Sequence, residues 1–343
     1  MTASARPGHG RSHFQRPTLV LSRCLEIDSC RYNGLAISAP IVKRLQPFAD
    51  LIPVCPELEI GLGVPRDPIS LVRTAPSGEP RLVQLSTGRD LTRTMHEFCS
   101  RFLGALSPAT DGFLLKSRSP SCGIHDAKVR SGAERGSAIL GRAPGLFGAA
   151  VLAAFPELPV THEGRMLNFR LREHWLTSVF TLARFRETVE ACASSGRIGA
   201  LVELHARLKL LLLAQGRVHL ERLGKIAANP ERRKAAGVLD DYGTALRAAL
   251  ARPSRSAANV DVLLHAMGHM KKMLSPGEKA FFLDSLEEYR QGRLPLSACC
   301  SMLRSWAVRF GNDYLLSQAY FEPYPRELLE LTDSGLGLSR GRP

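Results

Sequence analysis

Three cysteines that each come at or soon after the end of a short apolar run constrain this chain more than any other feature. Cys24 and Cys55 end two such runs and Cys122 follows a third, and the runs lie at residues 18–24, 50–55 and 112–116. Short apolar runs bounded by Gly and Pro predict buried strands. Helical patterns separate them, and this alternation predicts a parallel α/β sheet. Because ligands of such sheets bind beyond the carboxyl ends of the strands, we expect the three thiols to meet there.

The pattern changes after Glu163, where helical spacing alone continues to about residue 320. A length of 343 residues is too large for one ordinary core. We therefore expect an α/β domain followed by an all-α domain, with boundaries at 1–16 (disordered leader), 17–163 (α/β), 164–331 (all-α) and 332–343 (flexible tail). Further strands are expected at 69–73, 81–85 and 158–161. Helices are expected at 39–48, 92–106, 146–155, 168–193, 198–214, 217–228, 232–251, 257–274, 276–291, 295–310 and 314–320.

The charge of the chain favours a polyanionic partner. There are 46 Lys and Arg against 32 Asp and Glu, which gives a formal net charge of +14. Nucleic acid is the usual partner of such an excess, although solvated basic faces are the alternative interpretation. No apolar stretch reaches the ~20 residues that cross a bilayer, and residues 1–17 lack an apolar core, so we expect a cytoplasmic protein with no membrane partner.

The cysteines favour a metal or redox role. Eight cysteines in a chain of this size are too sparse for a disulfide framework. Cys24, Cys55 and Cys122 lack the Cys-x-x-Cys spacing typical of structural zinc, and three thiolates from three loops fit an iron–sulfur cluster better. Cys30 is a possible fourth thiol, and inert buried cysteines are the alternative. The remaining four are expected to be packing residues: Cys99, Cys192, Cys299 and Cys300.

Five motifs in the first half resemble the thiouracil desulfidase family, in order and in approximate spacing. They lie at residues 23–25, 30–34, 53–57, 61–66 and 115–123. The resemblance implies a [4Fe-4S] cluster held by Cys24, Cys55 and Cys122. It also implies a catalytic carboxylate and hydroxyl at Glu57 and Ser119. Two departures lie next to this site, namely Glu26-Ile27 in place of Leu-Gly and His125 in place of an aromatic residue.

The second half resembles the helical domain that often follows desulfidase domains in bacterial fusion proteins. The similarity lies at residues 171–175, 205–209, 259–265, 268–272 and 318–323. Such fusions are associated with removal of sulfur from 4-thiouridine in transfer RNA, so the resemblance implies thiolated tRNA as the partner. We expect contacts with the substrate or the RNA at Arg31, Tyr32, Asn33, Arg66, Lys116, Arg118, Ser121, Arg172, Lys209, Lys271 and Lys272.

The chemistry needs a soft Lewis acid for the sulfur and a base for the attacking water. An open iron provides the Lewis acid, and Glu57 is placed to take the proton of the water. Ser119 could hold the ring or the developing negative charge. Two alternatives stay open: a desulfidase of free thiouracil-type bases, and a non-catalytic RNA-binding regulator that carries a cluster. The oligomeric state, monomer or dimer, also stays open.

Two other motifs are weaker. The loop at 61–66 lacks the Gly-Lys-Ser/Thr ending of a phosphate loop, so we expect no nucleoside triphosphate. His265 and His269 share one helical face without an obvious third ligand, and helix-interface histidines are the favoured interpretation there.

Overall fold

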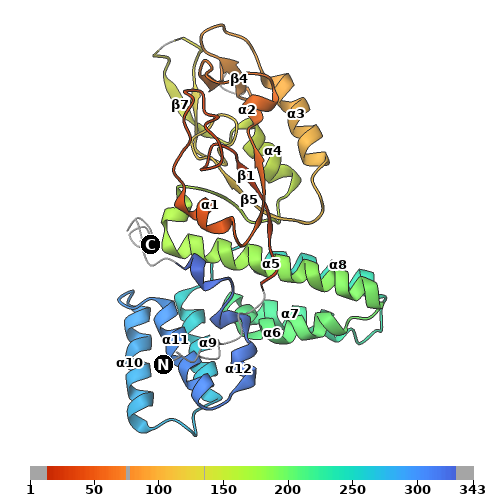
Figure 1. The fold of residues 1–343 in the computed structure, drawn as a ribbon, viewed down its shortest axis with the longest axis vertical. Coiled ribbons are helices and arrows are strands. Elements are labelled where there is room, and N and C mark those ends of the chain that lie inside the picture. Colours follow the sequence, from red (N-terminus) through yellow and green to blue (C-terminus); the bar gives the residue numbers. More distant parts are fainter. Residues whose placement is uncertain (1–13, 75–77, 135, 330–343) are drawn as a thin grey trace, which may run out of the picture.

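The computed structural model describes residues 14–74, 78–134 and 136–329, in which the two predicted halves lie at opposite ends of an elongated molecule (Figure 1). The first half contains β1 Thr18–Ser22, α1 Pro40–Leu45, β2 Asp50–Val54, α2 Pro56–Glu59, β3 Ile69–Val72, β4 Arg81–Gln84, α3 Thr92–Gly104, β5 Thr110–Leu115, β6 Ala127–Arg130, β7 Ile139–Ala143, α4 Leu146–Ala154 and β8 Val160–His162. The second contains η1 Arg165–Leu167, α5 Phe169–Ser195, α6 Gly199–Gln215, α7 Arg217–Ala228, α8 Ala235–Ala249, α9 Ser256–Gly268, α10 Pro276–Arg290, α11 Leu296–Arg309, α12 Asp313–Ser317, η2 Ala319–Phe321 and η3 Arg326–Leu328.

A four-stranded parallel sheet confirms the predicted fold class of the first half. Its strand order is β2-β1-β5-β8, and every neighbouring pair is parallel. The two central strands, β1 and β5, are buried, as in sheets that are covered on both faces, whereas the edge strand β2 is mostly half-buried. Three strands therefore end at one edge of this sheet, and each is followed by one of the three cysteines: Cys24, Cys55 and Cys122.

A second sheet, of order β4-β3-β6-β7, was only partly predicted. The expected hairpin is present as β3 and β4, although most of its turn lies outside the described residues. Strands β6 and β7 were missed. Ala127–Arg130 holds two cations in four residues, and all but the last residue of Ile139–Ala143 is exposed, so neither shows an apolar run. They are defined by pairing with each other and with β3 rather than by their own composition.

Helix α5 joins the two halves through a shared core. One face of the parallel sheet packs against α3 and α4, and Leu19, Leu21 and Leu114 on the other face cluster with Trp175 and Phe180 of α5. The approach is close at Gly112, where a Cβ atom would lie 2.8 Å from Val179 Cγ1. The expected boundary between residues 163 and 164 therefore crosses a continuous hydrophobic core rather than a linker.

Polar contacts add to this junction. Arg186 of α5 pairs with Asp111 at 2.9 Å, and the Trp175 indole donates to the Pro159 carbonyl oxygen at 3.1 Å. Phe14 and Arg16, which we expected in a disordered leader, are packed: Phe14 lies edge-on to Phe180, and Arg16 donates to the Ala49 carbonyl oxygen at 2.6 Å. Residues 1–13 of the expected leader and the whole expected tail, 332–343, lie outside the described part.

The second half is helical throughout its described residues, as predicted. Ser275 caps α10 in a capping box with Glu278, and Pro276 stands in the first turn as expected. Pro295 instead lies one position before α11, and α9 ends at Gly268, six residues earlier than predicted. Within the described ranges, no helix combines the length and the apolar composition needed to cross a membrane.

Candidate active site

Four thiols gather at the carboxyl edge of the parallel sheet. The Cys30 thiol is hydrogen-bonded to those of Cys24 and Cys55. The Cys55 sulfur also lies 3.9 Å from the Cys30 carbonyl oxygen. Cys122 contacts the hydroxyls of Ser22 and Ser119, and lies close enough to Cys55 for their charges to interact. The three thiols expected to meet thus lie in one group, with Cys30 among them.

Three thiols of the group, those of Cys30, Cys55 and Cys122, are buried and have raised pKa values. Burial is the main cause that raises the pKa of Cys122 far above its usual value. The hydrogen bond with Cys30, followed by burial, does the same for Cys55. The hydrogen bond to Cys24 is the largest cause that raises the pKa of Cys30, to about 11. A metal group that binds these sulfurs must displace their protons.

The arrangement fits a cluster better than a single ion. Among the described residues, no group of three or more His, Cys, Asp or Glu side chains converges closely enough to hold one metal ion. The irons of a cubane cluster sit at separate corners, so its ligands need not converge on one point. Thiols from three loops, buried at Cys55 and Cys122 and partly exposed at Cys24, are the soft donors that an iron–sulfur cluster requires, and these three would hold it.

The loop that carries Cys122 is clamped by the start of α4. The backbone N–H groups of Gly145, Leu146 and Gly148 donate to carbonyl oxygens of residues 120–123, at 2.8–3.1 Å. The contact is possible only without side chains, since a Cβ atom on Gly148 would lie 2.1 Å from the Gly123 oxygen. The N–H groups of a first helical turn have no partner within the helix, and here they fix the position of a sulfur ligand.

Glu57 is held between the loops of Cys55 and Cys122. Cys55 is the N-cap of α2, which places Glu57 in the first turn of that helix. Arg66 donates to Glu57 Oε2 through Nε at 2.8 Å and Nη2 at 2.6 Å, and Ser121 Oγ donates to Oε1 at 3.0 Å. The negative charge of Glu57 is one of the causes that raise the pKa of Cys122. The carboxylate is therefore fixed beside the thiol group.

Ser119 lies in the same loop. Its Oγ accepts hydrogen bonds from the backbone N–H groups of Ser121 at 3.2 Å and Cys122 at 3.0 Å. Because the Ser119 oxygen accepts both bonds, its hydroxyl proton is still free to be donated, and the Cys122 sulfur is within hydrogen-bond distance.

Three cations that were predicted to contact the substrate or the RNA instead bind carboxylate or carbonyl groups of the protein itself. The Arg66 side chain is 3% exposed in its pair with Glu57, and it donates to the Cys30 carbonyl oxygen at 3.0 Å. Lys116 forms an ion pair with Glu163. Arg172 is 2% exposed and donates to the Met166 carbonyl oxygen, so an RNA contact at this side chain is contradicted. A cation that is paired inside the fold and one that faces solvent look alike in a sequence, so these partners could not be predicted from it.

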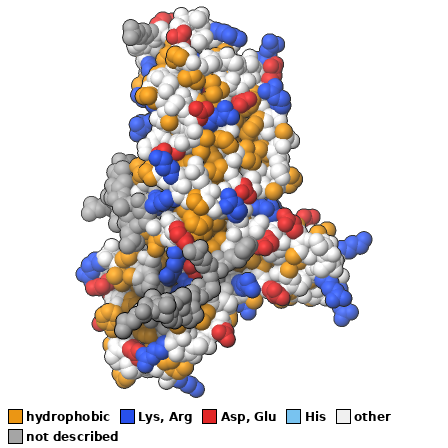
Figure 2. All heavy atoms as spheres, viewed as in Figure 1, with side chains coloured by type: hydrophobic (Ala, Val, Ile, Leu, Met, Phe, Trp, Pro, Cys, Tyr) orange, Lys and Arg blue, Asp and Glu red, His pale blue; other side chains and the backbone are white. Residues whose placement is uncertain are grey.

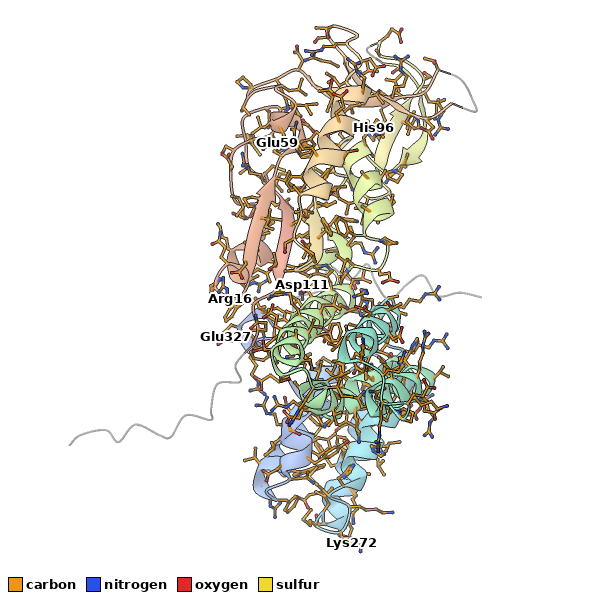
Figure 3. The ribbon with its side chains drawn as sticks, turned by 90° about the vertical axis from the view of Figure 1, so that its right-hand side faces the viewer. Arg16, Glu59, His96, Asp111, Lys272 and Glu327 are labelled. Atoms are coloured by element: carbon orange, nitrogen blue, oxygen red, sulfur yellow. The ribbon has the colours of Figure 1, made fainter. Side chains whose placement is uncertain are left out.

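The other predicted contact residues lie in two separate regions of the molecule. Tyr32, Asn33 and Arg118 are exposed on loops of the site, with the Arg31 guanidinium 5.4 Å from the Tyr32 ring centroid, whereas Ser121 is buried against Glu57. The exposed residues Lys209, Lys271 and Lys272 belong to the helical half. Figure 3 shows Lys272 at the end of the molecule opposite Glu59 of α2.

Sequence reasoning missed three residues that order this site. Ser22 accepts from the Lys116 N–H at 2.9 Å, Glu163 accepts from the Ser117 N–H and hydroxyl at 2.8 and 2.6 Å, and Asp126 accepts from the Arg118 N–H at 2.8 Å. Ser22 and Glu163 stand at the carboxyl ends of β1 and β8. The rule that located the cysteines would have found both.

The two departures from the family pattern have different surroundings. Glu26 faces α1: it accepts from Ser38 Oγ and from the Ala39 N–H, and it pairs with Lys43. Glu26 therefore connects the loop that carries Cys24 to α1. His125 is exposed, with its ring centroid 5.4 Å from that of the buried His162.

Comparison with known proteins assigns both halves. Residues 19–163 match the family model described as 2-thiouracil desulfurase, and residues 209–325 match a family described as a protein of unknown function, DUF1722. The uncharacterized protein YbbK of Bacillus subtilis is 30% identical over 110 residues, which cover 31% of this chain and 72% of YbbK. The uncharacterized protein YbgA of Escherichia coli is 28% identical over 142 residues, which cover 40% of this chain and 82% of YbgA.

A solved structure, the [4Fe-4S]-dependent thiouracil desulfidase TudS, is 24% identical and covers 44% of this chain and 93% of its own, with a TM-score of 0.35. That score is too low to support an argument by itself. The sequence matches are sufficient: through its first domain the chain belongs to the 2-thiouracil desulfurase family, whose members cleave a carbon–sulfur bond. A DUF1722 domain follows in the same chain, which confirms the expected fusion.

Proposed function

We propose that this protein is a [4Fe-4S]-dependent desulfidase that removes sulfur from 4-thiouridine in transfer RNA and leaves uridine. The observation that carries the proposal is the position of Glu57, fixed by Arg66 and Ser121 next to the group of thiols that ends three parallel strands. The family of the first domain supports the reaction, and the net charge of +14 supports a polyanionic substrate.

The roles of the chain's own residues follow from their contacts. Glu57 accepts the proton of the attacking water, because its carboxylate is oriented by two partners on either side. Ser119 presents a hydroxyl at the edge of the Cys122 loop, where it can donate to an atom of the ring. When bound, the cluster would supply an open iron that acts as a soft Lewis acid toward sulfur.

The surface of the helical half supports RNA as the substrate. The connection between α7 and α8 carries Arg232, Arg233 and Lys234, all of them exposed. Figure 2 shows Lys and Arg side chains at the tip of the arm that these helices form. The exposed Arg118 and the Arg31–Tyr32 pair lie at the site itself, where an aromatic ring and a guanidinium provide faces for a base that has left its stack.

Cys122→Ala is expected to abolish sulfur release, because it removes a predicted cluster ligand. The measurement is anaerobic reconstitution of both proteins, with iron and sulfide counts, followed by sulfide release from thiolated tRNA. Cys99→Ala is the matched control, since Cys99 is equally buried but lies in α3 within the core. Equal activity of Cys122→Ala and the unmodified protein would rule out the site.

The same assay separates the candidate substrates. We expect faster release from intact thiolated tRNA than from free 2-thiouracil or 4-thiouracil at equal concentration. A higher rate on the free bases would favour the thiobase alternative. If the protein binds a cluster but releases sulfide from none of these substrates, the result would favour the alternative of a non-catalytic RNA-binding regulator.

Replacing Arg232 and Lys234 together by Ala is expected to weaken tRNA binding and to make it less salt-dependent. Each phosphate contact contributes about 0.9 to the slope of log K against log salt, so the slope should fall by roughly 2. Filter binding at several salt concentrations measures this slope. Arg93→Ala, an exposed cation of α3, is the control expected to leave it unchanged.

A further inference from the structure

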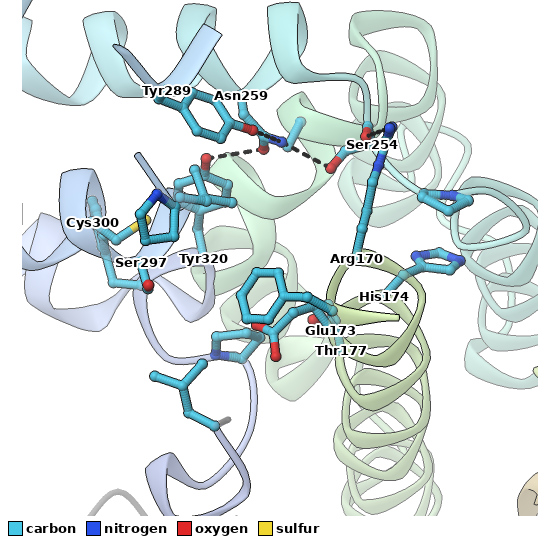
Figure 4. A pocket seen from close by; sticks show the side chains of 18 of the residues that line it. Arg170, Glu173, His174, Thr177, Ser254, Asn259, Tyr289, Ser297, Cys300 and Tyr320 are labelled. Carbon is cyan, nitrogen blue, oxygen red and sulfur yellow. Dashed lines mark hydrogen bonds between the residues drawn. The ribbon is translucent and has the colours of Figure 1, made fainter. Parts of the chain in front are cut away.

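A cavity of about 690 Å³ lies in the helical half, lined by none of the four thiols of the candidate active site. It is enclosed by the first turns of α5, the segment before α9, the connection from α10 to α11 and the residues around η2 (Figure 4). Its volume is within the range of sites for small organic ligands. Aromatic side chains form much of its wall: Phe169, Tyr289, Tyr320, Phe321 and Tyr324.

A completed hydrogen-bond network fixes two of these rings. Tyr320 Oη donates to Asn259 Oδ1 at 3.0 Å, and Asn259 Nδ2 donates to Tyr289 Oη and to Ser254 Oγ, each at 3.1 Å (Figure 4). Asn259 is 4% exposed, and both ends of its amide are engaged. The wall is therefore ordered before any ligand arrives, as is usual for a binding site.

Glu173 is a residue of the lining whose carboxylate the fold satisfies only in part. Its carboxylate is hydrogen-bonded to Tyr324, but its Oε1 atom is buried and has no hydrogen-bond partner among the described residues. Glu173 and Tyr320 face the same space in Figure 4. A buried acceptor without a partner is costly in the free protein, so a ligand that donates an N–H there gains from meeting it.

The charge of the lining favours an anionic ligand. Among the described residues that line the cavity there are four arginines, at 170, 293, 304 and 326, and two glutamates, Glu173 and Glu322. Arg304 pairs with Glu322 at 2.7 Å. Arg170 and Arg293 are exposed at the edge, where Arg170 donates to the Ser254 carbonyl oxygen. Flat rings inside and guanidinium groups at the edge suit a planar base joined to a phosphate.

The cavity is connected to the candidate active site by a short segment. Glu163, which binds Ser117, is six residues before Phe169, which lines the cavity. Six residues span at most roughly 20 Å. One RNA molecule can therefore reach both places.

We propose that this cavity binds one unstacked nucleotide of the RNA substrate, with the base against the aromatic wall and Glu173, and the phosphate at Arg170 and Arg293. The partner class rests on the proposed function, but the site can be tested without it. Binding of unmodified tRNA needs neither a thiolated base nor a cluster. A protein that binds nucleotides here but releases no sulfide would refute the reaction and leave this site intact.

Calorimetry with guanosine 5′-monophosphate tests the site directly, with ribose 5-phosphate as the probe that lacks a base. We expect the nucleotide to bind at least tenfold more tightly than the sugar phosphate. We also expect it to compete with unmodified tRNA in filter binding. Ser297→Phe, which places a ring in the cavity without changing any charge, should weaken both interactions tenfold or more.

Glu173→Gln provides a second readout that a structural role would not give. Burial raises the Glu173 pKa from 4.5 to about 7. The charged carboxylate therefore destabilises the folded protein, with no effect below about pH 4.5 and the full effect above about pH 7. Tyr324, Arg172 and Cys300 are the titratable or charged groups that interact with it. The variant should therefore melt at a higher temperature at pH 8, with little difference at pH 5. It should bind the nucleotide at least fivefold more weakly. Glu187→Gln, on the exposed side of the same helix, should change neither property.

Several outcomes would overturn the proposal. Equal affinity for ribose 5-phosphate and the nucleotide would show that the arginines bind phosphate alone. Nucleotide binding that leaves tRNA binding unchanged would show a free nucleotide as the ligand. A Glu173→Gln protein that melts lower at pH 8 and binds the nucleotide as before would show a structural glutamate.

Discussion

Glu57→Gln is expected to lower the rate of sulfur release by about 10²- to 10⁴-fold, the usual contribution of a positioned general base. The amide keeps the shape of the side chain and can still accept from Ser121, but it cannot take a proton from water. The measurement is single-turnover sulfide release under anaerobic conditions, with the absorbance of the cluster recorded for the same sample. The cluster should be retained, because no ligand is changed.

The variant has a side effect that needs its own control. Glu57→Gln leaves the Arg66 guanidinium, which is 3% exposed, without its counter-charge, and a buried charge that loses its partner costs about 3–5 kcal/mol. The double variant Glu57→Gln, Arg66→Met removes the stranded charge. It should recover much of the lost stability while sulfur release stays low. Recovery of activity in the double variant would show that Glu57 acts only through folding. Glu59→Gln, exposed on the same short helix, should behave like the unmodified protein.

Gly148→Ala is expected to disturb the Cys122 loop and to reduce the cluster content. A Cβ atom at this position would lie 2.1 Å from the Gly123 carbonyl oxygen and 3.0 Å from that of Cys122, so backbone on one side must move. Overpacking of this kind costs about 1–3 kcal/mol. Iron and sulfide counts after reconstitution, together with the midpoint of urea unfolding, measure the two effects.

Gly237→Ala is the matched substitution for this experiment. Gly237 lies in α8 with nothing within 4 Å of the added methyl, so the higher helix propensity of Ala should stabilise the protein by about 0.5–1 kcal/mol. The two glycine variants are therefore expected to shift stability in opposite directions. A Gly148→Ala protein with full cluster content and unchanged stability would mean that the helix does not hold the loop.

The role of Arg66 follows from the same contacts. It was predicted as a residue that touches substrate or RNA, and the structure instead places its guanidinium on Glu57 and on the carbonyl oxygens of Cys30 and Gly63. The loop at 61–66 thus connects the proposed base to the segment that carries Cys30. We interpret Arg66 as a positioning residue whose guanidinium keeps the Glu57 carboxylate oriented next to buried thiols.

His125 is the departure from the family pattern that bears on the substrate. It is exposed, and it lies at the end of the Cys122 loop, with His162 beside it. Burial lowers the pKa of His162, and its Nδ1 atom has no partner among the described residues. The two imidazole rings at this position offer a flat, polar face to a base, where an aromatic residue was expected from the family resemblance.

The sequence by itself determined the parallel sheet, the helices of the second half and the place where three cysteines meet. Apolar runs at residues 18–24, 50–55 and 112–116 predicted three strands, and the helical patterns between them indicated that the strands run parallel, as they do. Parallel strands end at one edge, so the positions of Cys24, Cys55 and Cys122 after these runs were enough to predict that they would meet. The helices of the second half could also be predicted from the sequence, because a helix that buries one face has apolar residues at helical spacing.

Only the tertiary structure decided which charged groups are paired and which are exposed. Lys116, Arg66 and Arg172 look like surface cations in the sequence, yet their partners are at residues 163, 57 and 166. Strands β6 and β7 and the cavity around Glu173 also depend on contacts between distant segments. The physical reason is the same in each case. Hydrophobic periodicity is a local property of the chain, whereas a salt bridge, a sheet edge or a cavity exists only after separate segments have been packed together.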